Sequence, residues 1–123
     1  MADAQKRVLI VEDERPLAHA LELKLQHEGF ATVVAQNGEE CLKAIDEQIF
    51  DVVLLDLVMP VLDGFQVLEQ LRQKPQMPVV FVLSNLSQAE DEMRVRNLGA
   101  KKYFIKSDTS LEVIVNEVKQ ASS

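Results

Sequence analysis

The feature that most constrains the fold of this chain is a regular alternation of two apolar patterns. Short runs of β-branched and other apolar residues recur along the sequence, bounded by turn or charged residues. Most of these runs lack the polar alternation of a half-solvated strand, so they are typical of strands buried on both faces of a parallel sheet. The five runs are residues 8–11, 31–34, 52–55, 79–82 and 103–105.

Between these runs, apolar residues recur every three or four positions, which is the spacing of the buried face of a helix. Asn37, Ser87 and Thr109 each stand three residues before a glutamate, the spacing of a capping box. The sequence therefore predicts five strands alternating with five helices. With right-handed crossovers, this order gives an open α/β sheet with helices on both faces, and we expect one domain over residues 1–123.

Composition and charge exclude several classes of protein. The chain has 123 residues, 47% of them hydrophobic, which is enough for one core. Its net charge is −7, and no basic stretch extends beyond Lys101-Lys102, so we expect no binding to nucleic acid by this chain alone. The first apolar run is too short for a signal peptide core or a membrane span. We therefore expect a cytoplasmic protein with no membrane partner.

Charged and polar residues follow four of the five predicted strands. Glu12 and Asp13 follow the first run, Asp56 the third, Ser84 the fourth and Lys106 the fifth. In open α/β sheets the ligand crevice lies at the carboxyl ends of the strands, where the strand order reverses. We therefore expect these five side chains to form one site.

The residue types of this expected site point to phosphoryl transfer assisted by a metal. Three neighbouring carboxylates repel one another, and a hard divalent cation such as Mg²⁺, which prefers oxygen ligands, removes that repulsion. Mg²⁺ and Lys106 would supply positive charge around a phosphoryl group, and Ser84 would donate a hydrogen bond to one of its oxygens. Asp56 ends the most apolar strand, and its carboxylate is the candidate nucleophile.

The sequence also resembles the receiver domains of response regulators in two-component signalling. Residues 56–64 read DLVMPVLDG, which is similar to the D-x-x-M-P-x-x-D-G signature of that family. Glu12-Asp13, Ser84 and Lys106 resemble the rest of the family's site, in the same order along the whole chain. The resemblance implies a flavodoxin-like three-layer sandwich, with a five-stranded parallel sheet of order 2-1-3-4-5 and five helices.

The resemblance also implies a role for each residue of the site. Asp56 would be the phosphoacceptor, with Lys106 and Ser84 assisting. Mg²⁺ would be held by Glu12, Asp13, Asp56 and the backbone carbonyl of Val58. On phosphorylation Ser84 would move toward the phosphoryl group, and Tyr103 would change from an exposed to a buried position. We expect no other catalytic activity than the protein's own phosphorylation and dephosphorylation.

The implied partners are other signalling proteins. The phosphodonor would be a histidine kinase, a phosphotransfer protein or a small acyl phosphate. The output would be a protein bound by the face of the fourth helix, fifth strand and fifth helix, with Arg94, Lys102 and Glu117 as candidate contacts. Formation of a homodimer on phosphorylation is a further expectation. The sequence identifies neither the kinase nor the output protein.

Three positions depart from the family's common pattern. Ser107 replaces the usual proline after Lys106, and Asn85 replaces a small residue after Ser84. The third position is Leu86, directly after Asn85. Because a cis Lys-Ser bond costs about 3 kcal/mol, we expect a trans bond and a reshaped loop. Val58 and Leu86 are expected to flank the phosphoryl group. Neither can orient water, which predicts slow self-dephosphorylation.

Two alternative functions stay open at this point. The chain could be a receiver-like scaffold that binds a partner without phosphorylation, but such a protein would be expected to lack an essential group, and Asp56 and Lys106 are both present. It could also be a small α/β hydrolase or phosphatase in which Asp56 is a transient nucleophile. That class usually needs a second catalytic carboxylate and a cap, and no insertion in this sequence is long enough for a cap.

Overall fold

The structure, a computed structural model, describes residues 5–59, 61–86 and 88–122. Its strands form one parallel sheet in the order β2-β1-β3-β4-β5, as expected. Each strand lies within two residues of its predicted position. The strands are β1 (Arg7–Val11), β2 (Ala31–Ala35), β3 (Val52–Asp56), β4 (Val79–Ser84) and β5 (Lys102–Ile105).

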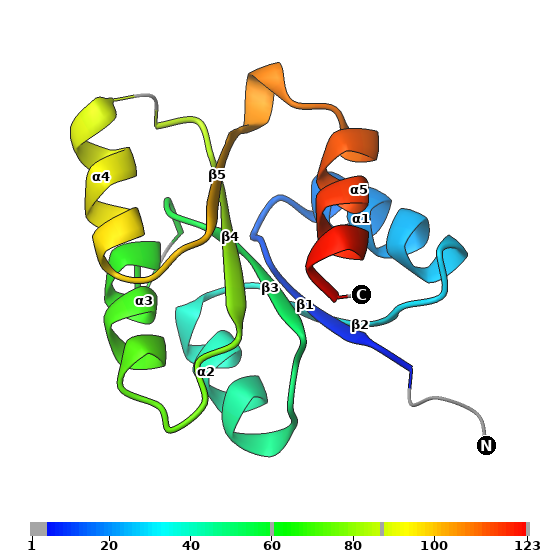
Figure 1. Ribbon diagram of the computed structural model, residues 1–123, viewed down its shortest axis with the longest axis horizontal. Coiled ribbons are helices and arrows are strands. Elements are labelled where there is room, and N and C mark those ends of the chain that lie inside the picture. Colours follow the sequence, from blue (N-terminus) through cyan, green and yellow to red (C-terminus); the bar gives the residue numbers. More distant parts are fainter. Residues whose placement is uncertain (1–4, 60, 87, 123) are drawn as a thin grey trace.

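Five helices cover the two faces of this sheet, which confirms the predicted three-layer α/β architecture (Figure 1). Helices α1 and α5 lie on one face, and α2, α3 and α4 lie on the other. A short 3₁₀ helix, η1 (Lys106–Asp108), follows β5. The helices are α1 (Arg15–His27), α2 (Gly38–Glu47), α3 (Gly64–Arg72), α4 (Ala89–Asn97) and α5 (Leu111–Ser122).

Side chains of alternate residues in the central strands pack into two separate apolar clusters, one on each face of the sheet. Leu55 of β3 packs into the cluster beneath α2, α3 and α4, whereas its neighbour Leu54 packs into the cluster beneath α1 and α5. Every residue of β3 is buried, while most residues of the outer strands β2 and β5 are only partly buried. The difference follows from the strand order, because a central parallel strand has no solvated face.

The helix starts agree with the predicted caps in part. Asn37 caps α2, since its side chain accepts a hydrogen bond from the backbone N–H of Glu40. The prediction for α5 was wrong by one residue. Ser110, not Thr109, precedes the helix, and its hydroxyl accepts from the backbone N–H of Val113 at 3.2 Å. The predicted cap at Ser87 lies outside the described residues, as does Pro60 of the signature.

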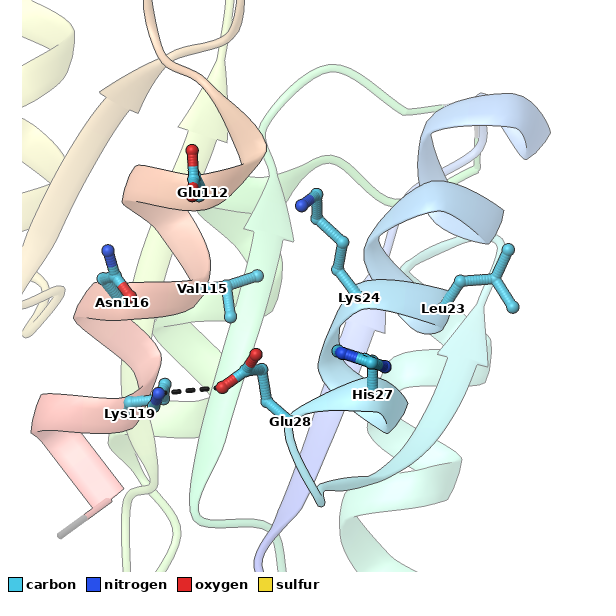
Figure 2. A pocket seen from close by; sticks show the side chains of 8 residues that line it. All are labelled: Leu23, Lys24, His27, Glu28, Glu112, Val115, Asn116 and Lys119. Carbon is cyan, nitrogen blue, oxygen red and sulfur yellow. Dashed lines mark hydrogen bonds and ion pairs between the residues drawn. The ribbon is translucent and has the colours of Figure 1, made fainter.

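Helices α1 and α5 are joined by an ion pair across a groove on their outer side (Figure 2). Lys119 Nζ lies 2.8 Å from Glu28 Oε1, and Glu28 is the C-cap residue that follows α1. Because α1 begins at the carboxyl end of β1, this ion pair lies toward the opposite edge of the sheet. It joins the last helix to the end of α1, and it lies away from the strand ends where polar residues were predicted to meet.

Among the residues that the structure describes, no helix has both the length and the apolar character that crossing a bilayer requires.

Candidate functional site

The strand order places a crevice at the carboxyl ends of β1 and β3. The chain leaves β1 for β2 on one side, whereas β3 lies on the other side, and ligands of open α/β sheets bind at such a reversal. Glu12, Asp13 and Asp56 meet there, with a carboxylate oxygen of each within 4.8 Å of the other two. The three acids that were predicted to share a site are therefore brought together.

Asp56 is held rigidly at the end of β3. Its side chain is buried, and Oδ1 accepts a hydrogen bond of 3.1 Å from the backbone N–H of Val58. The turn behind it needs a glycine at Gly64, because a Cβ atom there would lie 2.6 Å from Leu57 Cα and 2.7 Å from the Asp56 carbonyl oxygen. Asp63 caps α3 through a capping box with Gln66, as its place in the signature suggests.

Lys106 reaches into the crevice from η1 and binds three carboxylates. Its Nζ donates to Asp56 Oδ2 and Glu12 Oε2, each at 3.1 Å, and to Glu14 Oε2 at 2.6 Å. The first two contacts join residues that the sequence predicts to meet. Glu14 was missed, although a third acidic residue in the run after β1 is a signal that could have drawn attention to it.

Burial and crowding shift the pKa values of these groups. The pKa of Glu12 is raised to about 7, chiefly by burial; the hydrogen bond from Lys106 lowers it and the charge of Asp56 raises it, and burial outweighs the hydrogen bond. Burial likewise raises the pKa of Asp56. Burial lowers the pKa of Lys106, but its hydrogen bonds to Glu14 and Glu12 outweigh burial and raise that pKa above its ordinary value. One ammonium therefore does not neutralise the site.

The oxygen atoms of the site fit a hard divalent cation. Glu12 Oε1 is buried and lies 2.9 Å from Lys106 Nζ, yet it has no hydrogen-bond partner among the described residues. Asp13 is exposed at the rim of the crevice. An unsatisfied buried oxygen beside two further carboxylates is costly, and Mg²⁺ would relieve that cost with the oxygen ligands it prefers.

Ser84 and Tyr103 meet at the backbone of Leu86. Ser84 is fully buried, and its Oγ accepts a hydrogen bond of 3.1 Å from the Leu86 N–H. The Tyr103 hydroxyl donates to the Leu86 carbonyl oxygen. Tyr103 is thus half-buried rather than exposed in this structure, which corrects its expected starting position. Its predicted movement with Ser84 stays a prediction.

The peptide bond after Lys106 has the trans form that the sequence predicts. The Lys106–Ser107 bond is trans, and the backbone N–H of Ser107 donates to Asn85 Oδ1 at 3.1 Å. A proline at this position could not make that bond. The bond joins the loops that carry Ser84 and Lys106. An open pocket of about 320 Å³ lies over the site, lined by Asp13, Glu14, Asp56, Val58, Asn85, Leu86 and Lys106.

The predicted partner contacts lie on α4, β5 and α5. The Arg94 guanidinium stacks 4.0 Å from the centre of the Phe65 ring, which attaches α4 to α3. Lys102 of β5 pairs with Glu117 of α5 at 3.3 Å. His19 and His27 are exposed on α1, and neither lines the pocket above Asp56.

Comparisons with known proteins all point to one family. The family model of the response regulator receiver domain matches residues 8–119. The probable transcriptional regulator ycf27 of Guillardia theta is 35% identical over 118 residues, which are 94% of this chain and 46% of that protein. The chain therefore spans about half the length of this curated relative.

Two solved structures have the same fold as this chain and are also similar to it in sequence. The receiver domain of the Francisella response regulator 1452 is 29% identical, with a TM-score of 0.90 over 96% of this chain and 97% of that one. The response regulator TrrA from Thermotoga maritima, solved in complex with Mg²⁺-BeF, is 31% identical, with a TM-score of 0.83 over 95% of this chain and 99% of that one.

Proposed function

Since this chain belongs to the response regulator receiver domain family, we propose that it is a phosphorylation switch in which Asp56 is the phosphoacceptor. One observation carries the proposal. The buried Asp56 carboxylate lies at the carboxyl end of the central strand, 3.1 Å from Lys106 Nζ and beside two more carboxylates suited to a metal. This arrangement joins a nucleophile to the positive charge that phosphoryl transfer needs.

The side chains divide the reaction between them. An Asp56 carboxylate oxygen attacks phosphorus, and the bond from phosphorus to the donor's oxygen or nitrogen breaks, with its electron pair leaving on the donor. Lys106 neutralises charge on the phosphoryl oxygens, and Ser84, once released from Leu86, donates a hydrogen bond to one of them. Glu12, Asp13, Asp56 and the Val58 carbonyl would hold Mg²⁺, which when bound supplies further positive charge to the same oxygens.

The donor and the output follow from this role. We assign the phosphodonor to a histidine kinase, a phosphotransfer protein or a small acyl phosphate, and we place the reaction in the cytoplasm. The output surface is the face of α4, β5 and α5, because Tyr103 connects that face to the loop after Ser84 through Leu86. An output protein or a second copy of the chain would bind there when the switch is phosphorylated. The chain acts on no external substrate.

The test is stoichiometric labelling. Wild type and Asp56→Asn are incubated with acetyl phosphate and Mg²⁺, and the intact proteins are weighed. Wild type is expected to gain one phosphoryl group, and Asp56→Asn is expected to gain none, because an amide oxygen is a poor nucleophile. Asp63→Asn is the matched control, since it changes a carboxylate to an amide on the same loop but outside the crevice.

Two outcomes would contradict the proposal. Labelling of Asp56→Asn at the wild-type rate would place the phosphoryl group on another residue. A wild type that stays unlabelled, but that still binds partners through the face of α4, β5 and α5, would favour the scaffold alternative. Release of free phosphate from external phosphoesters at many turnovers per chain would instead favour the hydrolase alternative.

A further inference from the structure

All three N–H donors of the Lys106 ammonium are engaged before any phosphoryl group arrives. They point to Glu12, Glu14 and Asp56, at 3.1, 2.6 and 3.1 Å respectively. A lysine ammonium has only three donors. A phosphoryl oxygen on Asp56 can therefore bond Lys106 only if one of these carboxylates gives up its donor.

Glu14 is the carboxylate that can be displaced at least cost. Its side chain is 60% exposed, against 2% for Glu12, so water can replace the lost ammonium at Glu14 but not at Glu12. The donor that Asp56 occupies passes to its own phosphoryl group, and Glu14 remains the competitor that can yield a second donor. The Glu14 side chain also does not stabilise the start of α1 by capping. Glu14 occupies the cap position, but its side chain makes no capping hydrogen bond to the helix.

We infer that Glu14 is a positioning residue that holds Lys106 in its resting place and competes with the phosphoryl group for the Lys106 ammonium when Asp56 is phosphorylated. The inference rests on the proposed function and concerns the same reaction. Glu14 also lines the pocket above Asp56, so it adds negative charge where an anionic donor enters. Both effects oppose phosphorylation, and both weaken when the carboxylate becomes an amide, which can still accept a hydrogen bond but carries no charge.

The first measurement is the rate of Asp56 labelling by acetyl phosphate in saturating Mg²⁺. Glu14→Gln is expected to label about two- to fivefold faster than wild type, which is the range that an exposed ion pair can account for. Glu39→Gln is the matched control, because it removes one exposed carboxylate from the first turn of α2 and causes the same change in net charge. It is expected to label at the wild-type rate.

A second variant separates contact from charge. Glu14→Asp keeps the charge but is one methylene shorter, so it should lose much of its contact with Lys106. The inference predicts faster labelling in Glu14→Asp as well as in Glu14→Gln. If Glu14→Asp labels like wild type while Glu14→Gln is faster, charge at the pocket mouth acts alone and the positioning role is overturned.

The third measurement is an equilibrium one. Beryllofluoride imitates the phosphoryl group on Asp56 and would compete with Glu14 for the same Lys106 donor. It is expected to bind Glu14→Gln about two- to fivefold more tightly than wild type. A variant that was only destabilised would bind it more weakly, so tighter binding distinguishes competition from damage to the fold.

The labelling experiment with wild type and Asp56→Asn distinguishes a failure of the inference about Glu14 from a failure of the proposed function. If wild type is labelled on Asp56 and the Glu14 variants match it in both rate and beryllofluoride affinity, the inference about Glu14 fails while the proposed function stands. If wild type is not labelled at all, the proposed function fails and the role of Glu14 falls with it.

Discussion

At the scale of single residues, Val58 is an apolar side chain beside the proposed phosphoacceptor. It is 59% exposed and lines the pocket above Asp56 together with Leu86. Hydrolysis of an acyl phosphate needs a water molecule in line with the leaving carboxylate, and neither apolar side chain can orient one. We therefore predict a long-lived phosphoryl group in wild type.

Replacing Val58 with asparagine should shorten that lifetime. The amide can hold the attacking water, and a hydrogen bond worth about 0.5–1.5 kcal/mol corresponds to a rate increase of roughly two- to tenfold. The measurement is the phosphoryl half-life of the two proteins side by side. Val61→Asn is the control, because Val61 is exposed on the same loop but does not line the pocket, and its φ of 72° suits asparagine. Equal decay in wild type and Val58→Asn would refute the water-access argument.

A second prediction at this scale concerns pH and Glu12. The pKa of Glu12 is about 7 in the folded protein, above its ordinary value of 4.5, so between these values the folded state holds a proton that the unfolded state has lost. The free energy of unfolding of the metal-free protein should therefore fall as the pH rises from about 4.5 to 7.

The check is urea unfolding of wild type and Glu12→Gln in a chelating buffer across that pH range. Glu12→Gln cannot titrate at this position, so its stability should fall less steeply than that of wild type. Saturating Mg²⁺ should flatten the wild-type curve, because the metal favours the ionised carboxylate. Parallel curves for the two proteins would show that Glu12 does not carry the effect.

Sequence reasoning found Glu12, Asp13, Asp56, Ser84 and Lys106 but not Glu14. Asp56, Glu12 and Lys106 were predictable because each directly follows a strand, and parallel strand ends converge on one edge of a sheet. Glu14 belongs to the same acidic run, but its contact with Lys106 depends on the path of a loop more than ninety residues away along the chain. No spacing rule relates two such positions.

At the scale of elements, the loops after β4 and β5 are tied by the hydrogen bond between Ser107 and Asn85. The two positions each depart from the family's pattern, and the sequence alone does not show that they bind one another. The structure accounts for both departures together, because a backbone N–H at residue 107 and an amide oxygen at residue 85 form one pair.

Ser107→Pro tests this pair. Proline removes the N–H and also disfavours the helical conformation of the preceding Lys106, which begins η1. We predict a loss of roughly 1 kcal/mol in the free energy of unfolding and slower labelling of Asp56, because Lys106 is displaced. Urea unfolding and intact mass provide the two measurements.

Ser107→Ala is the matched variant for that experiment. It removes the side-chain hydroxyl but keeps the backbone N–H, so its stability and labelling rate should stay close to those of wild type. If Ser107→Ala is as damaged as Ser107→Pro, the side chain rather than the backbone donor matters at this position.

Element boundaries were predictable only where a local rule decides them. The strands were located because buried parallel strands are continuous apolar runs. The start of α5 was misplaced by one residue, because Thr109 and Ser110 are both good caps and only tertiary packing chooses between them. Helix α4, with Val95 as its buried residue, has the weakest apolar face and was predicted mainly from its place in the alternation.

At the scale of the whole molecule, an acidic site on an acidic protein should couple metal binding to folding. The net charge is −7, and three carboxylates converge at one edge of the sheet. Mg²⁺ binds the folded site but has no comparable site on the unfolded chain. At ten times its dissociation constant it should therefore raise the free energy of unfolding by about 1.4 kcal/mol.

The measurement is the melting temperature with and without Mg²⁺ for wild type, Asp13→Asn and Asp46→Asn. Asp13→Asn should show a much smaller rise than wild type, because it removes the negative charge of a proposed metal ligand from the crevice. Asp46→Asn removes the same charge at the far end of α2, where the side chain pairs with Lys74, and should rise as wild type does. Equal rises in all three proteins would locate the metal elsewhere.

The complete burial of β3 has a consequence for the time scale of the switch. Amide hydrogens in such a strand exchange with deuterium only when much of the molecule opens, whereas the outer strands β2 and β5 exchange through smaller fluctuations. Asp56 ends the strand that opens last. The rate of acyl phosphate hydrolysis would thus be set by the access of water to the phosphoryl group, and not by local unfolding of the strand that ends in Asp56.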